Sequence, residues 1–166
     1  MATEYSFSFN NENCIQCYGC EVACRSWRGL ELGVKWRSVK NIWIGQYPKV
    51  KNTSVAVACM HCADPVCVDA CPSGALKKRA KDGIVVVDRG KCTGCKTCLE
   101  VCPYNVPVYG ADGKMQKCDL CVHDIDHDRE FPPCVETCPT QALQLVKMYP
   151  REKKKEEQRI KKLIAM

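Results

Sequence analysis

Cysteine constrains the fold of this chain more than any other residue type. The 166 residues include 16 cysteines, which fall into four groups of four with none left over. Groups one and three share the spacing C-x2-C-x2-C-x3-C, while the middle gap is four residues in group two and twelve in group four. So regular a pattern predicts that disulfides or bound metal supply much of the folding free energy. The groups are Cys14, Cys17, Cys20, Cys24; Cys59, Cys62, Cys67, Cys71; Cys92, Cys95, Cys98, Cys102; and Cys118, Cys121, Cys134, Cys138.

Composition and local hydropathy favour metal over disulfides. Phe, Trp and Tyr make up only 7% of the chain, so a large hydrocarbon core is not available. Residues 1–13 have neither the basic start nor the apolar stretch of a signal peptide. The longest apolar runs, Val55–Cys59 and Ile84–Val87, are far shorter than the roughly 20 residues of a membrane span. We expect a cytoplasmic chain without membrane insertion whose cysteines are metal ligands; co-export with a signal-bearing partner is the alternative.

The spacing within each group favours iron-sulfur clusters over zinc. Every group ends with a C-x3-C step, and proline follows the last cysteine in three of the four groups. In the bacterial ferredoxin pattern, three such cysteines hold one 4Fe-4S cube and the fourth reaches a second cube. We expect each triplet to form a tight loop with N–H groups directed at the sulfides, and the fourth cysteine to begin a helix. Zinc knuckles, which come as separated cysteine pairs, are the alternative and would make the chain a structural module.

The segment between groups two and three indicates which groups share clusters. Residues 72–91 predict a short helix, a turn at Asp82-Gly83 and a strand at Ile84–Val87 before the next binding loop. That layout favours groups two and three sharing one pair of cubes, in which case groups one and four share the other. The predicted ligand sets are Cys14, Cys17, Cys20 and Cys138 for cluster 1; Cys24, Cys118, Cys121 and Cys134 for cluster 2; Cys71, Cys92, Cys95 and Cys98 for cluster 3; and Cys59, Cys62, Cys67 and Cys102 for cluster 4.

This pairing predicts an α+β fold made of two bacterial-ferredoxin-like modules, the outer one nested around the inner one. The outer module comprises residues 1–58 and 107–146, the inner module residues 59–106, and the charged C-terminal tail residues 147–166. The tail has helix-forming composition, with Ile160, Leu163 and Ile164 on one stripe. Two interpretations stay open: a solvated terminal helix, or a helix that docks its stripe on a partner subunit.

Four complete four-cysteine sets predict electron transfer and no bond-making chemistry. No iron is left open to a substrate, so we expect a non-catalytic subunit that relays electrons through four 4Fe-4S clusters. A catalytic partner at one end and an electron donor or acceptor at the other are then required. The formal net charge of +6 counts thiols as neutral. Sixteen thiolates, offset only in part by the iron-sulfide cores, make the loaded chain slightly negative, which argues against nucleic-acid binding.

Several other residues have both a plain and a functional interpretation. His61, inside the second binding loop, is either a simple loop residue or a group that tunes the adjacent cluster. Residues 123–128, HDIDHD, are either a solvated loop or a metal site. We expect Trp27, Trp36 and Trp43 to pack, and their segment to cover the first module and face the partner.

Four motifs resemble a known family. They are CxHCxxPxC at 59–67, CPSGAL at 71–76, CPYNVPVYG at 102–110 and KCDLC at 117–121. In this order they resemble the iron-sulfur electron-transfer subunit of the dimethyl sulfoxide reductase family, with a match over roughly residues 10–146. The resemblance implies a double ferredoxin fold, four clusters with the nested pairing, and a large catalytic subunit carrying molybdenum or tungsten on a pterin. It also implies a further redox partner, namely a flavin subunit, a ferredoxin or a membrane anchor.

Two departures from the family pattern leave alternatives for the partner. Members attached to a membrane anchor are usually longer, and a short leaderless chain also suits a tungsten aldehyde oxidoreductase. Similar small subunits serve hydrogenases and formate dehydrogenases, which are the nearest alternatives. Some members replace one ligand with Trp or Ser and hold a 3Fe-4S cluster; here all sixteen positions are Cys, so four cubes are expected.

Overall fold

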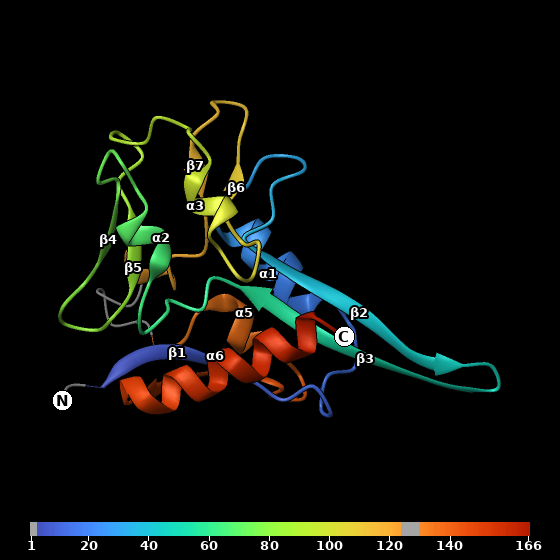
Figure 1. Cartoon of the computed structure of the whole chain (residues 1–166). Helices are drawn as coiled ribbons and strands as arrows, with labels where there is room; N and C mark the ends of the chain where they lie inside the picture. Colours follow the sequence, from blue (N-terminus) through green and yellow to red (C-terminus); the bar gives the residue numbers. More distant parts are fainter. Residues whose placement is uncertain (1–2, 124–129) are drawn as a thin grey trace.

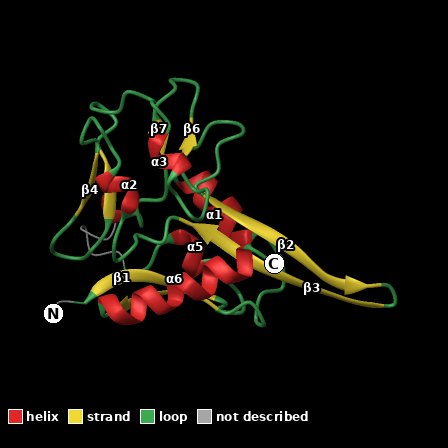
Figure 2. Ribbon diagram, viewed as in Figure 1, coloured by secondary structure: helices red, strands yellow, loops and turns green. Residues whose placement is uncertain are grey.

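The computed structural model describes residues 3–123 and 130–166. In those residues the strands pair as four two-stranded antiparallel sheets, three of them local hairpins and one long-range (Figures 1 and 2). The pairs are β1 (Glu4–Phe9) with β8 (Leu143–Met148), β2 (Arg37–Gln46) with β3 (Lys49–Ala58), β4 (Leu76–Lys78) with β5 (Val85–Val87), and β6 (Val108–Tyr109) with β7 (Met115–Gln116). The helices are α1 (Gly19–Trp27), α2 (Val66–Asp69), α3 (Thr97–Glu100), α5 (Pro133–Glu136) and α6 (Pro150–Ile164).

The β1–β8 pair brings the two ends of the chain together. In β1, Phe7 and Phe9 share one face and are buried, and Ser6 on the opposite face is also buried, so both faces of the strand are covered there. Phe9 lies opposite Leu143, and Phe7 lies opposite Leu145. The strand before the first cysteine group therefore packs against the strand after the last one.

The β2–β3 hairpin is buried at its base and exposed at its tip. Val55, Val57 and Ala58 are buried in the main core, whereas the distal half of both strands is exposed. In Figure 1 the tip projects well beyond the rest of the molecule. Trp43, near the tip, is 68% exposed, so the expectation that it packs is wrong. The strand reaches beyond the available core, and its side chains there have no neighbouring layer to cover them.

The other two tryptophans behave differently from each other. Trp36 is partly buried against the core, and its Nε1 donates a hydrogen bond to Gln116 Oε1 at 3.2 Å. The Arg28 guanidinium lies 4.8 Å from the centre of its ring. Trp27, at the end of α1, is half-buried with 51% of its surface exposed, so the packing prediction is confirmed most clearly for Trp36.

Helix α6 is an integral part of the core. It begins at Pro150, with Glu152 Oε2 accepting a hydrogen bond from Tyr149 N at 3.1 Å. Ile160 is 2% exposed, and Leu163 and Ile164 pack against the main core. Helix formation and the apolar stripe are confirmed. The stripe is covered by β1, β3 and β8 of the same chain, which corrects both the solvated and the partner-docking interpretation.

The inner region corrects one element and confirms two. The helix predicted after Cys71 is absent; the chain turns at Gly74 (φ 60°) and enters strand β4. Pro72 and Gly74 disfavour a helix there, and Leu76 gains a buried position opposite Val87. The turn near Asp82-Gly83 and the strand over 84–87 are confirmed, the strand as β5. Across the described ranges, no helix combines the length and apolarity that crossing a bilayer requires.

Candidate metal centres

All four binding loops share one unusual backbone conformation. The residue two positions after the first cysteine has a left-handed φ in each loop: Gln16 at 59°, His61 at 49°, Gly94 at 74° and Leu120 at 58°. Left-handed residues next to right-handed ones turn successive N–H groups to one side, which forms a concave site for anions. This conformation fits a negatively charged cluster. The sequence reveals it only at Gly94, because glycine is the one residue of the four that prefers this region.

A short helix starts at the third cysteine of each group, not at the fourth as expected. Cys67, Cys98 and Cys134 lie in the first turns of α2, α3 and α5, and Cys20 lies at the start of α1. In three groups the fourth cysteine follows two residues after its helix ends, and only Cys24 lies within a helix. The x3 step spans one helical turn, so it carries the chain from one cysteine across to the next site.

Three cavities of the described structure are each lined by a complete set of four cysteines, three from one group and one from another. The sets are Cys14, Cys17, Cys20 and Cys138; Cys71, Cys92, Cys95 and Cys98; and Cys59, Cys62, Cys67 and Cys102. These are the combinations that the spacing assigns to clusters 1, 3 and 4. The remaining lining is largely apolar, including Pro65, Val66 and Tyr104 around the third set.

The fourth set, Cys24, Cys118, Cys121 and Cys134, is buried throughout. Burial raises the pKa of Cys118 well above its ordinary value, and negative charge on Cys24 and Cys134 raises it further. Burial likewise raises the pKa of Cys121 to about 12, with Asp119 and Cys134 adding to the effect. The mutual repulsion of their thiolates indicates that these cysteines share one region.

The cysteines surround space rather than meeting at one point. In the ranges 3–123 and 130–166, no three His, Cys, Asp or Glu side chains form a group that could hold a metal ion. A single zinc ion would need its thiolates about 2.3 Å from one centre. A 4Fe-4S cube fits the four-cysteine cavities instead, because each of its irons takes one thiolate.

Cys71 and Cys138, the fourth cysteines of groups two and four, have similar surroundings that stabilise the thiolate form. Burial acts to raise the pKa of Cys71, but hydrogen bonds from the Ser73 hydroxyl and from backbone N–H groups lower it below its ordinary value. At Cys138 burial is opposed in the same way by Thr140 and by backbone N–H groups, again with a lowered pKa. The repeat C-P-x-x-A-L, at 71–76 and 138–143, is the sequence signal for these shared surroundings.

His61 is a buried structural residue. Its Nδ1 accepts a hydrogen bond from Val85 N at 3.0 Å, and its Nε2 has no partner in the part of the chain that the structure describes. Burial lowers its pKa well below the ordinary value, with Lys117 adding to the effect, so the ring is neutral at pH 7. His123 is exposed, whereas the remainder of the 123–128 segment lies outside the described residues.

Two buried cations near the cysteines were not predicted. Lys117 lines the cavity of the Cys59 set, and its Nζ donates hydrogen bonds to Cys118 O at 3.0 Å and to Val85 O. Arg37 is 2% exposed at the start of β2. Lysine and arginine are usually placed at the surface when a sequence is read alone. Their nearness to repeated cysteine motifs was the only available signal.

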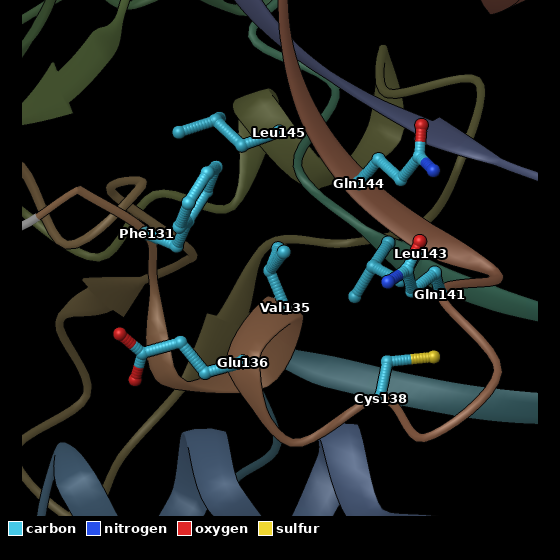
Figure 3. A pocket seen from close by; sticks show the side chains of 8 residues that line it. All are labelled: Phe131, Val135, Glu136, Cys138, Gln141, Leu143, Gln144 and Leu145. Atoms are coloured by element: carbon cyan, nitrogen blue, oxygen red, sulfur yellow. The ribbon is translucent and has the colours of Figure 1, made fainter.

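A further cavity of about 440 Å³ lies between α5 and β8, and Figure 3 looks into it. Cys138 is the only cysteine among its lining residues and sits at one side, opposite Phe131 and Leu145. Its lining residues are Phe131, Val135, Glu136, Cys138, Gln141, Leu143, Gln144 and Leu145. With a single thiol it cannot hold a cube, so it lies outside the four candidate centres.

Comparisons with known proteins agree with this geometry. Residues 50–148 match the 4Fe-4S dicluster domain family, and residues 11–27 match a 4Fe-4S binding domain. A component of the anaerobic dimethyl sulfoxide reductase of Escherichia coli strain K12 is 37% identical over 155 residues, which cover 86% of this chain and 73% of that protein. The chain therefore belongs to this family of iron-sulfur subunits. Its ferredoxin-like domains bind iron-sulfur clusters for electron transfer, so the predicted resemblance is confirmed.

Relatives of other named complexes show how widely the family is used. The formate dehydrogenase iron-sulfur subunit of Wolinella succinogenes is 35% identical over 159 residues, covering 82% of this chain and 78% of that protein. A sulfite dehydrogenase subunit of Allochromatium vinosum is 34% identical over 151 residues, covering 78% of this chain and 62% of that protein. The shared element is an iron-sulfur subunit of an oxidoreductase complex.

Proposed function

We propose that this chain is a non-catalytic subunit that relays electrons through four 4Fe-4S clusters between a catalytic subunit and another redox partner. The observation that carries the proposal is the set of three cavities, each lined by four cysteines drawn from two groups. The ligands would be Cys14, Cys17, Cys20 and Cys138; Cys24, Cys118, Cys121 and Cys134; Cys71, Cys92, Cys95 and Cys98; and Cys59, Cys62, Cys67 and Cys102. When bound, the cubes supply one-electron redox chemistry.

Helix contacts support two nested modules. Helix α1 contacts α5, which joins groups one and four, and α2 contacts α3, which joins groups two and three. The β1–β8 pair closes the outer module across the whole chain. We therefore assign residues 1–58 and 107–146 to the outer module and 59–106 to the inner one. The last segment then consists mainly of helix α6.

The catalytic partner in this proposal carries molybdenum or tungsten on a pterin. Relatives are named as parts of dimethyl sulfoxide reductase, sulfite dehydrogenase and formate dehydrogenase. The role common to them is that of the iron-sulfur subunit, so the substrate is set by the catalytic subunit. A formate dehydrogenase complex is the second candidate because one relative, at 35% identity, has that name.

The projecting β2–β3 hairpin is the surface we assign to the catalytic subunit. Trp43 and Tyr47 are exposed near its tip, Tyr47 by 93%. Residues 32–63 contain no Asp or Glu but include Lys40, Lys49 and Lys51, so the hairpin suits an acidic surface with apolar hollows. Replacing Trp43 and Tyr47 with Ser should abolish retention of the pterin subunit. The matched change at exposed Leu32, outside the hairpin, should leave retention unchanged.

Metal analysis of the complex tests the proposal. The complex would be isolated anaerobically from its native source through a tag on this chain. We expect about sixteen irons per chain, plus those of the partner, with about one molybdenum or tungsten per complex. Iron without either heavy metal would move the partner to a hydrogenase-type enzyme. Zinc in place of iron would contradict the electron-transfer role.

A further inference from the structure

Arg37 is a buried cation without a carboxylate partner in the described structure. Its Nη1 donates to Ala56 O at 3.4 Å, while its Nε and Nη2 have no hydrogen-bond partner among residues 3–123 and 130–166. The guanidinium lies 4.1 Å from the centre of the Phe7 ring. A buried guanidinium with two unused donors would be strongly destabilising unless negative charge is placed beside it. Within residues 3–123 and 130–166, the countercharge must therefore come from groups other than Asp or Glu.

Among the described residues, the negative groups that act most strongly on Arg37 are cysteine sulfurs of the outer module. Burial lowers the pKa of Arg37, but negative charges on Cys134, Cys118, Cys20 and Cys24 outweigh burial and raise it. Under the ligand sets of the proposed function, Cys20 belongs to cluster 1 and the other three to cluster 2. One cation thus faces ligands of two clusters. Its unused N–H groups are donors that cluster sulfur can accept.

We propose that Arg37 is the shared internal countercharge of clusters 1 and 2 and that it raises the reduction potential of both. This inference rests on the proposed ligand sets. Each reduction adds one electron from the redox partner to a cube, with no bond made or broken. A nearby positive charge in a water-excluded site stabilises the more negative, reduced form. Arg37 is a positioning residue that sets where electrons reside along the relay.

Lys117 differs from Arg37 although it is equally buried. Its ammonium donates to two backbone carbonyls, so part of its hydrogen-bonding capacity is already used by the protein. It lines the cavity of the Cys59 set, and one of its two acceptors is the carbonyl of Cys118. We therefore assign Lys117 mainly to cluster 4, whose cavity it lines, and Arg37 to clusters 1 and 2. Replacing Arg37 should shift the potentials of clusters 3 and 4 less than those of clusters 1 and 2.

The test is a redox titration of the anaerobically isolated complex, followed by electron paramagnetic resonance. Replacing Arg37 with Gln or Met removes the charge, and Met also removes the unsatisfied donors, so folding does not depend on one variant. Either change should lower the potentials of clusters 1 and 2, with at least a tenfold loss in the one-electron reduction constant, or about 59 mV. Arg37→Lys should stay near wild type. The same Arg→Gln change at exposed Arg89, which pairs with Asp112, should leave all four reduction potentials unchanged.

Iron content separates failure of this inference from failure of the proposed function. Wild-type protein without iron would overturn the proposed function and, with it, the role of Arg37. Sixteen irons in wild type and in Arg37→Met, with all four potentials unchanged, would overturn the countercharge alone. A shift at cluster 3 as large as that at clusters 1 and 2 would also overturn it, because the sulfurs that act most strongly on Arg37 all belong to the outer set. Signals are assigned to clusters with Cys14→Ala and Cys118→Ala variants.

Discussion

The Cys24 set and the Cys71 set, which we assign to clusters 2 and 3, place their four thiolates in opposite environments, one buried and one partly exposed. All four cysteines of the first set are buried, whereas in the second Cys95 is exposed and only Cys98 is buried. Burial raises the pKa of Cys118, whereas hydrogen bonds from Thr97 lower that of Cys95. The buried site thus needs an internal cation, while water and local donors suffice at the exposed one. Cys17, in the set we assign to cluster 1, is exposed as well, so the Cys24 set is the most enclosed of the four.

The largest effect should come from removing a ligand at the buried centre. Cys118→Ala leaves the cube one thiolate short inside the main core, where water cannot replace it. Since metal binding is part of the folding free energy, we expect a loss of about 4 kcal/mol, or roughly 10 °C in the unfolding midpoint. Cys95→Ala is the matched change at the exposed centre and should cost less than half as much. Equal losses in calorimetry would remove the distinction between the two centres.

The next effect concerns the ion pairs of Glu4, which link the outer and inner regions. Glu4 in β1 accepts from Lys153 of α6 at 3.0 Å and pairs with Lys78 of β4 at 2.7 Å. Glu4→Gln leaves Lys153 buried beside a neutral group, so we expect a loss of about 2 kcal/mol at pH 7, measured by denaturant unfolding. The exposed pair of Lys154 and Asp64 gives the control, and Asp64→Asn should change stability far less than Glu4→Gln does.

The same ion pairs predict a pH dependence. Burial acts to raise the pKa of Glu4, but its bonds to Lys78 and Lys153 lower it overall. A lowered folded-state pKa means that the stabilisation is complete above the unfolded value of about 4.3. It should be lost as the pH falls through the lower folded value. Glu4→Gln should reduce the loss of stability at low pH. An unchanged pH dependence would show that the ion pairs of Glu4 do not contribute to it.

Oxidative loss of iron should distinguish the two centres by rate. With Cys95 exposed, oxidant and water reach cluster 3 directly, whereas the Cys24 set is covered by core residues. Ferricyanide treatment would be monitored by Mössbauer spectroscopy. The signal of the exposed centre should decay severalfold faster than that of the buried centre. Faster decay at the buried centre would contradict the claim that burial protects the Cys24 set from oxidation.

The smallest effect concerns one hydrogen bond at the exposed centre. The Thr97 hydroxyl donates to Cys95 Sγ at 3.5 Å, which favours negative charge on that sulfur. Thr97→Ala should lower the potential of cluster 3 by less than 59 mV, a less than tenfold change. Thr97→Ser keeps the hydroxyl and should leave the potential near wild type. A shift in potential as large as that expected for Arg37→Gln would mean that solvent exposure does not weaken electrostatic interactions at cluster 3.

Spacing made parts of this architecture predictable because the constraint is local and covalent. Cysteines two and three residues apart must lie on one loop and one helical turn, whatever surrounds them. The predicted ligand sets stay predictions, although three of them line one cavity each. The turn at 82–83 and the strand after it were likewise set by Asp-Gly followed by a β-branched run.

Long-range packing made the rest unpredictable. Arg37 is charged and reads as a surface residue, since nothing in its neighbourhood reveals the distant cysteines that surround it. The stripe of α6 was correct, but only the fold shows that β1 and β8 cover it. Trp43 reads as a core residue, yet the hairpin extends past the core. In each case the deciding neighbours are remote in sequence.

The most direct test of cross-group ligation compares three alanine variants of the isolated complex by Mössbauer and electron paramagnetic resonance spectroscopy. Cys138 comes from group four, as Cys118 does, but lines the cavity of Cys14 in group one. We predict that Cys138→Ala and Cys14→Ala alter the same spectral component, and that Cys118→Ala alters a different one. If Cys138→Ala instead matches Cys118→Ala, each group holds its own cluster and the nested relay is wrong.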